Sequence, residues 1–517
     1  MAAAHATTEA PGPMSGLPLV ITAAALAFGA FMQVLDATIA NVAIPTLAGN
    51  MGVSTSQGAW AITSFAISGS ISVPLSGWLM ARYGVVRTFV WAIGLFTITS
   101  LLCGLAWDLP SLVFFRVLQG AFSGPMVPGS QALMVSIFPA AKRGTALGLW
   151  SLTTLLSPIT GPQLGGYICD NYSWRWLFLI NVPVGLLCGF FTWIYMRRRE
   201  TATRRVPVDA VGFVLLVLWV GALQIMLDTG KEHDWFASPV ITAEAVVAAT
   251  ALAAWLIWEL TEAHPIVDLS LLKSRNFVLS TIPFALGFAV FFGVTVIQPT
   301  WLQTRMSYPA MVAGFVSTPA GVVSILMMPL ITRVMSRFDA RITATVSLAS
   351  FAVTFNMRSG WSTDADFWTF ALPSVVQGFA ASTFFVSLVT LTLNGLRPAQ
   401  IPAASGLSNF IRLTAASFAA SITTTAYDSG AAMHQTRLAE AMGAHGEALA
   451  GAVTRMQAAG YGAGQALTAI TEQVVRQAYT LSLLDIYRAS AWVVLLAIPC
   501  VWFTSRAVGD SKVAVAD

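Results

Sequence analysis

Long apolar stretches recur along the whole chain, separated by short polar segments. Each is about twenty residues or longer, which is enough for a helix to cross the hydrocarbon core of a bilayer. Of the 517 residues, 56% are hydrophobic and only 10% are charged, a balance far more apolar than that of a water-soluble domain. The sequence therefore predicts an all-α membrane protein.

About fourteen such stretches can be counted. They fall near 17–45, 57–79, 88–107, 111–138, 145–169, 174–196, 209–228, 239–260, 276–301, 311–334, 341–358, 367–394, 403–427 and 484–505. Gly and Pro inside them are compatible with membrane helices, because neighbouring helices and side chains satisfy the backbone groups that these residues free. We expect no metal site, because the Cys residues lack ligand spacing.

The distribution of Lys and Arg between alternate loops predicts the orientation of the bundle. With the N-terminus inside, the inner loops carry Arg82, Arg87, Lys142, Arg143, Arg197 to Arg199, Arg204, Arg205, Lys273, Arg275, Arg333, Arg337, Arg341 and Arg397. The short outer loops carry only Arg175, Lys231, Arg305 and Arg358. By the positive-inside rule both termini are cytoplasmic. The cations behind the net charge of +4 lie at helix ends and indicate orientation, so the positive charge does not predict a nucleic-acid partner. We interpret the first stretch as a span, not a signal peptide, because no Lys or Arg precedes it.

Asp36 in the first stretch and Arg116 in the fourth are charged residues inside predicted spans. A charge in a bilayer costs ~3 kcal/mol or more, so such residues usually belong to a transport or proton pathway. Counted from the helix ends at ~1.5 Å per residue, their depths agree and the two side chains can pair. Two interpretations stay open: a permanent structural ion pair, or a carboxylate that binds and releases a proton as its environment changes.

A short segment recurs in the two halves of the chain. The sequence VLQGA at 117–121 returns as VVQGF at 375–379, and a Gly-Leu pair follows each at the same distance. Chance similarity in a Gly-rich chain is the alternative, but the repeat indicates two six-helix bundles of parallel orientation. We expect an N-terminal bundle over 1–200, two inserted helices over 201–265 and a C-terminal bundle over 266–517. Within the last, 428–482 is expected to be an extracytoplasmic segment.

Several motifs resemble those of the major facilitator superfamily. The sequence GWLMARYG at 77–84 resembles its loop motif G-x-L-a-D-r-x-G, and LVFFRVLQG at 112–120 its helix-four motif l-x-x-x-R-x-x-q-G. GPQLGG at 161–166 matches the antiporter motif G-P-x-x-G-G, and LDATIANVAIP at 35–45 resembles the signature of fourteen-span drug:proton antiporters. The similarity covers nearly the whole chain and extends to EmrB-type multidrug exporters. It departs at Ala81, where the loop motif has an Asp that joins the two halves through a charge network.

The resemblance implies a facilitator fold of two six-helix bundles with two linking helices, and a proton-coupled efflux antiporter in the bacterial inner membrane. It implies proton coupling by Asp36 and Arg116, with Gln119 and Gly120 completing the helix-four motif. It further implies an antiporter motif of Gly161, Pro162, Gly165 and Gly166 and a gating loop with Gly77, Arg82 and Gly84. The glycines leave a helix surface on which a neighbour can approach and slide. No cofactor is expected beyond the proton gradient.

The substrate pocket is predicted from polar and aromatic residues inside the spans. The candidates are Gln33, Asn41, Trp150, Phe288, Phe292, Gln377, Phe384, Asn409 and Arg412. Two buried arginines, Arg116 and Arg412, against one buried acid favour lipophilic weak acids or neutral aromatic compounds over cationic dyes. Aromatic side chains suit the adaptable apolar pockets of promiscuous binders, although any one of them is more often plain packing.

Residues 428–482 are rich in Ala, and Leu438, Met442, Leu449, Val453 and Met456 have the spacing of an amphipathic helix. Such a segment either caps the bundle or, as the resemblance implies, docks a periplasmic adaptor protein that leads to an outer-membrane channel. Other functions remain as alternatives: a facilitator-fold lipid exporter or an importer of a small amphipathic metabolite. An enzyme is not expected, because the five His residues lie in the tail or loops, and no ATP-binding P-loop is found.

Overall fold

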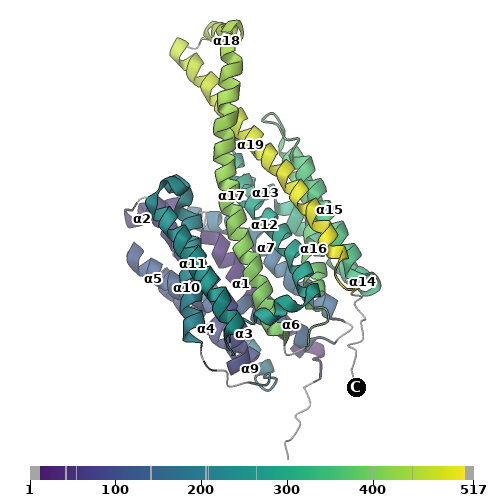
Figure 1. Ribbon diagram of the computed structural model, residues 1–517. Coiled ribbons are helices and arrows are strands. Elements are labelled where there is room, and N and C mark those ends of the chain that lie inside the picture. Colours follow the sequence, from purple (N-terminus) through teal and green to yellow (C-terminus); the bar gives the residue numbers. More distant parts are fainter. Residues whose placement is uncertain are drawn as a thin grey trace, which may run out of the picture.

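The computed structural model describes residues 12–40, 44–53, 55–139, 142–203, 207, 209–263, 265–397, 400–444, 446–460 and 462–506. The part of the chain so described is helical and contains no strand, which confirms the predicted all-α fold. Figure 1 shows a bundle of long helices from which one helical hairpin projects.

The N-terminal half contains α1 to α9. These are α1 (Gly16–Ile39), α2 (Ile44–Met51), α3 (Thr55–Tyr83), α4 (Val85–Gly104), α5 (Leu109–Ser123), α6 (Met126–Ile137), α7 (Arg143–Asn171), α8 (Trp176–Leu179) and α9 (Asn181–Met196). The predicted span 111–138 is divided into α5 and α6 by Gly124 and Pro125, because Pro lacks the backbone N–H that would continue the helix.

Two helices link the halves, and the C-terminal half follows. The linking helices are α10 (Ala210–Thr229) and α11 (Pro239–Thr261), joined by the short 3-10 helices η3 (Gly230–His233) and η4 (Trp235–Ala237). The rest are η5 (Leu269–Lys273), α12 (Arg275–Thr304), α13 (Ala310–Phe315), α14 (Thr318–Arg337), α15 (Ala340–Arg358), α16 (Phe367–Leu393), α17 (Ile401–Ala444), α18 (Gly446–Ala458) and α19 (Ala463–Trp502).

Nine helices among the described residues are long and apolar enough to cross a membrane by themselves. The other predicted spans coincide with helices that are interrupted or less apolar, so the count of fourteen stays a prediction that the structure is consistent with. Arg358 corrects the loop assignment: it was predicted in an outer loop, but it ends α15 and is 1% exposed. Arg358 ends both the predicted stretch and the helix, but its side chain turns inward to Gln377 and Ser374 and does not reach the loop.

The two halves touch each other along several helices, and two of these contacts lie nearer opposite ends of the bundle. Nearer one end, α3 packs on α17, where a Cβ on Gly77 would lie 3.1 Å from the Cα of Ala403. Nearer the other end, Gln163 of α7 donates hydrogen bonds to the carbonyl of Gly314 (3.1 Å) and the hydroxyl of Thr318 (3.0 Å). Small residues allow the first contact and a long polar side chain makes the second.

The segment 428–482 is the projecting hairpin, not a separate cap. Helix α17 continues without a break to Ala444, α18 lies at the tip, and α19 returns from Ala463 (Figure 1). No Pro interrupts 428–482, and the Ala-rich composition favours helix outside the bundle as well as inside it. The predicted amphipathic residues, such as Leu438 and Met456, are half-buried within the hairpin.

Candidate functional site

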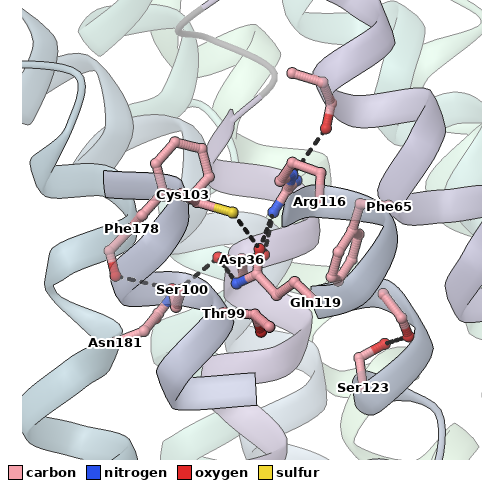
Figure 2. Close-up of polar contacts among 12 residues, drawn as sticks. Asp36, Phe65, Thr99, Ser100, Cys103, Arg116, Gln119, Ser123, Phe178 and Asn181 are labelled. Carbon is pink, nitrogen blue, oxygen red and sulfur yellow. Dashed lines mark hydrogen bonds and ion pairs between the residues drawn. The ribbon is translucent and has the colours of Figure 1, made fainter. Parts of the chain in front are cut away.

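Asp36 and Arg116 form an ion pair inside the N-terminal half (Figure 2). Nη1 of Arg116 lies 2.5 Å from Oδ2 of Asp36, and both side chains are fully buried. Asp36 stands in the last turn of α1 and Arg116 in the middle of α5. The helical rise predicted that the two residues lie at the same depth, and in the structure their side chains are in direct contact.

Polar groups from neighbouring helices complete the surroundings of this pair. Oδ1 of Asp36 accepts hydrogen bonds from Nδ2 of Asn181 at 2.7 Å and from Nε2 of Gln119 at 3.2 Å. Arg116 donates through Nε to the carbonyl of Ala61 at 2.8 Å and through Nη1 to Oε1 of Gln119 at 2.9 Å. Its Nη2 has no hydrogen-bond acceptor among the described residues. The site thus joins α1, α3, α5 and α9.

Sequence reasoning missed Asn181 and the residues of α4 in this site. Asn181 also donates to Oγ of Ser100 at 3.0 Å, and Sγ of Cys103 donates to Oε1 of Gln119 at 3.4 Å (Figure 2). Asn181 carried a signal, because an amide within an apolar stretch needs a partner. Ser100 and Cys103 carried none, since small residues of this kind also pack in any helix.

Aromatic rings cover the guanidinium on two sides. The Cζ of Arg116 lies 4.3 Å from the ring centre of Phe65 and 5.2 Å from that of Phe178. Ring faces attract cations, and they also keep water out. Because water is excluded, the electrostatic attraction between Asp36 and Arg116 is stronger than it would be at a surface.

The motif glycines lie where helices approach one another most closely. A Cβ on Gly120 would overlap Ser68 and the carbonyl of Phe65 on α3. A Cβ on Gly161 would overlap Thr38, and one on Gly165 would come within 2.6 Å of the carbonyl oxygen of Ile39, both on α1. Gly166 is half-buried on the same helix, and the side chain of Pro162 lies outside the described residues.

The loop between α3 and α4 is held by an acid from elsewhere in the chain. Gly84 has φ +92, a conformation that side chains disfavour. The carboxylate of Glu200 accepts hydrogen bonds from the backbone N–H of Val86 (3.0 Å) and Arg87 (2.9 Å). Arg82 lies over the ring of Trp78 at 5.3 Å. Glu200 thus supplies an acid at the start of α4, close to the last turn of α3, where Ala81 stands in place of the usual Asp of the motif.

Arg412 lines a narrow cavity between the halves. Its walls come from α6, α12, α16 and α17 and are formed by Gln131, Phe284, Val389, Thr392, Leu393, Ser405, Ser408, Asn409 and Arg412. Arg412 donates through Nη2 to Oδ1 of Asn409, and its Cζ faces Phe288 at 4.7 Å. Nε of Arg412 and the hydroxyls of Ser405 and Ser408 are buried without a partner among the described residues. Unsatisfied polar atoms around a cavity are typical of a binding site.

The other pocket candidates are dispersed. Trp150 is fully buried and donates to Ser130 at 2.9 Å, and Phe384 packs on Phe284 and Phe351 in the core. Gln377 accepts from Arg358. Phe292 stacks on Phe288, and Gln33 is half-buried on α1. Asn41 lies outside the described residues. Of the predicted set, only Asn409 and Arg412 line the cavity, with Phe288 beside it.

The sequence pattern of the Major Facilitator Superfamily matches residues 26–420. The chain belongs to this superfamily. It is 44% identical to the multidrug export protein EmrB of Escherichia coli K12 over 96% of its own length and 97% of that protein. It is 41% identical to the fatty acid resistance protein FarB of Neisseria gonorrhoeae, with 95% and 97% covered.

A solved transporter structure shares the fold. The human organic anion transporter MFSD10 aligns with a TM-score of 0.58 at 12% identity, covering 94% of this chain and 100% of that one. Together with the nine apolar helices, the superfamily membership establishes a multi-pass membrane protein of the facilitator fold. The expected family and fold are confirmed.

Proposed function

We propose that this chain is a proton-coupled exporter of lipophilic small molecules. The observation that carries the proposal is the buried contact of 2.5 Å between Asp36 and Arg116. A carboxylate that is removed from water and held by one guanidinium is stable as an anion only while that contact lasts. Any rearrangement that separates the two favours uptake of a proton by Asp36.

A chain of contacts leads from Asp36 to the junction of the halves. Two residues after Asp36, Thr38 lies against Gly161 of α7, so that a shift of α1 presses directly on α7. Two residues after Gly161, Gln163 binds Gly314 and Thr318 of the other half. Protonation of Asp36 releases Arg116, and we infer that the resulting shift of α1 loosens the Gln163 contacts and opens this end.

In this mechanism the proton and the cargo alternate. With Asp36 charged, the pair holds the arrangement seen here, and with Asp36 protonated the N-terminal half relaxes. The Arg412 cavity has a volume of about 10 Å³, the size of one water molecule, so cargo binding widens it by moving α12, α16 and α17, which form its walls, away from α6. Because both events act on the contact between the halves, binding of one ligand changes the affinity for the other.

The substrates are inferred from the cavity and from the relatives. A guanidinium with aromatic neighbours suits compounds with an apolar body and an acidic or neutral polar group. Export of such compounds agrees with the relative EmrB, a multidrug export protein. The relative FarB, a fatty acid resistance protein, favours a second candidate, export of fatty acids or similar lipids.

The orientation and the partners complete the proposal. We place the protein in the bacterial inner membrane with both termini in the cytoplasm, on the strength of the loop cations. The hairpin of α17, α18 and α19 then extends into the periplasm, and its length beyond the bundle suits docking of a periplasmic adaptor protein. Deletion of residues 446–458 is expected to abolish drug resistance in cells while transport in vesicles persists.

Transport in inside-out vesicles tests the central claim. Asp36→Asn is expected to abolish proton-driven accumulation of substrate, because an amide cannot exchange a proton, while the variant still elutes as a folded protein. Asp108→Asn is the matched control: Asp108 is an exposed acid that caps α5, and its variant should transport normally. Undiminished active transport by Asp36→Asn would exclude Asp36 as the coupling group.

A further inference from the structure

The C-terminal half contains a buried arginine, Arg358, beside the glutamine that corresponds to Gln119. The repeat aligns Gln119 of α5 with Gln377 of α16. Gln119 accepts a hydrogen bond from Arg116, and Gln377 accepts one from Nη2 of Arg358 at 2.5 Å. Arg358 comes from α15, the helix before α16, just as Cys103 reaches Gln119 from α4, the helix before α5. Both halves thus place a guanidinium on the repeated glutamine.

The two arginines differ in how their charge is balanced. Arg116 faces Asp36, whereas Arg358 has no carboxylate in ion-pair distance among the described residues. It also donates to the neutral hydroxyl of Ser374 at 3.2 Å, and the phenol of Tyr487 interacts with it as a further neutral group. Arg358 is 1% exposed, so water at the surface does not balance its charge. A buried guanidinium in this condition requires an anion.

Other buried donors surround the same place. Tyr487 of α19 links them: its ring lies 5.9 Å from the Cζ of Arg358 and 5.4 Å from the ring of Trp361, and its hydroxyl donates to Oε1 of Gln298 at 3.4 Å. Nε of Arg358, Nε1 of Trp361 and Nε2 of Gln298 are all buried without an acceptor among the described residues. These three groups are donors only, and within the described part of the chain no acid lies in ion-pair distance of Arg358.

We propose that a small monovalent anion, with chloride as the probe, binds beside Arg358 and is held by the donors of Arg358, Gln298 and Trp361. Gln298 lies on α12, the helix that corresponds to α1 in the repeat, so the anion takes the place that the carboxylate of Asp36 has in the other half. The N-terminal half carries its negative charge on a side chain, and the C-terminal half takes its own from solution. The site is separate from the Arg412 cavity and from the proton-coupling pair.

Thermal unfolding of the purified protein tests this site. Chloride is exchanged for gluconate at constant ionic strength, and the unfolding midpoint is measured across chloride concentrations. A bound anion raises the folding equilibrium constant by a factor of 1 + [Cl⁻]/Kd, ~100-fold at a hundred times Kd. Identical midpoints in chloride and gluconate would overturn the proposal.

Two variants and a control separate this site from general salt effects. Gln298→Glu supplies an internal carboxylate, so its midpoint should no longer depend on chloride while the protein stays folded. Arg358→Gln should lose the dependence as well. Arg175→Gln is the control, because Arg175 is also an arginine stacked on a tryptophan, at 4.8 Å from Trp174, and its variant should keep the wild-type chloride dependence. Full chloride dependence in Gln298→Glu would place the anion elsewhere and refute the assignment.

Discussion

The stability of the protein should reveal the coupling between Asp36 and Arg116 directly. In Asp36→Asn, the amide oxygen can still accept from Asn181 and Gln119, which lie 2.7 and 3.2 Å from Oδ1. The contact of 2.5 Å with Arg116 is lost, and the guanidinium is left buried without its counter-charge. Removal of one partner from such a pair costs ~3–5 kcal/mol in the free energy of unfolding.

The double variant distinguishes the free energy lost with the ion pair from the cost of leaving one charge buried without a partner. Arg116→Gln leaves Asp36 unbalanced and should cost about as much as Asp36→Asn. Asp36→Asn combined with Arg116→Gln removes both charges and leaves neutral groups that can bond to one another. Its loss should fall below the sum of the single losses by ~3 kcal/mol, the upper range for residues in contact.

Denaturant unfolding in lipid nanodiscs, followed by tryptophan fluorescence, measures these free energies. Asp108→Asn again serves as the control, because the new side chain can still cap α5, and its stability should equal that of the wild type. If the two single losses simply add in the double variant, Asp36 and Arg116 do not interact and the reasoning fails.

Two further predictions concern the motif glycine of α7 and a helix cap. Gly165→Leu should abolish transport while membrane insertion persists, since even a Cβ there lies 2.6 Å from the carbonyl oxygen of Ile39. Gly94→Leu is the control and should transport normally, because nothing lies within 4 Å of its Cβ position. Normal transport by both variants would show that the glycine surface of α7 is not needed for transport. Hydrogen bonds from Ser111 hold the pKa of Asp108 below its usual value, so its stabilisation of α5 is complete above the unfolded pKa and is lost as pH falls through the lowered folded value. Hydrogen-exchange protection at the first turn of α5, measured as the exchange rate relative to that of an unstructured peptide at the same pH, should therefore be unchanged between pH 7 and pH 5 and fall only at lower pH. A fall in protection near pH 6 would contradict this cap.

Features of the site that depend on one helix alone could be predicted from the sequence. Depth along a helix follows from residue count, and this was enough to bring Asp36 and Arg116 to one height. The direction in which a side chain points depends on the rotation of its helix in the bundle, which no local pattern encodes. For this reason Asn181 was missed as a ligand of Asp36, and the predicted pocket proved to be spread over several parts of the core.

The sequence by itself determined that the chain is helical and spans a membrane, because apolar stretches of this length must satisfy their backbone within a helix. It also determined the superfamily through short motifs whose glycines permit close packing. Only the tertiary structure decided how each buried charge is balanced. Arg116 meets an acid from α1, whereas Arg358, predicted in a loop, is enclosed by neutral donors and rings. Charge balance depends on contacts within a few ångström between distant segments, and those contacts exist only once the helices have packed.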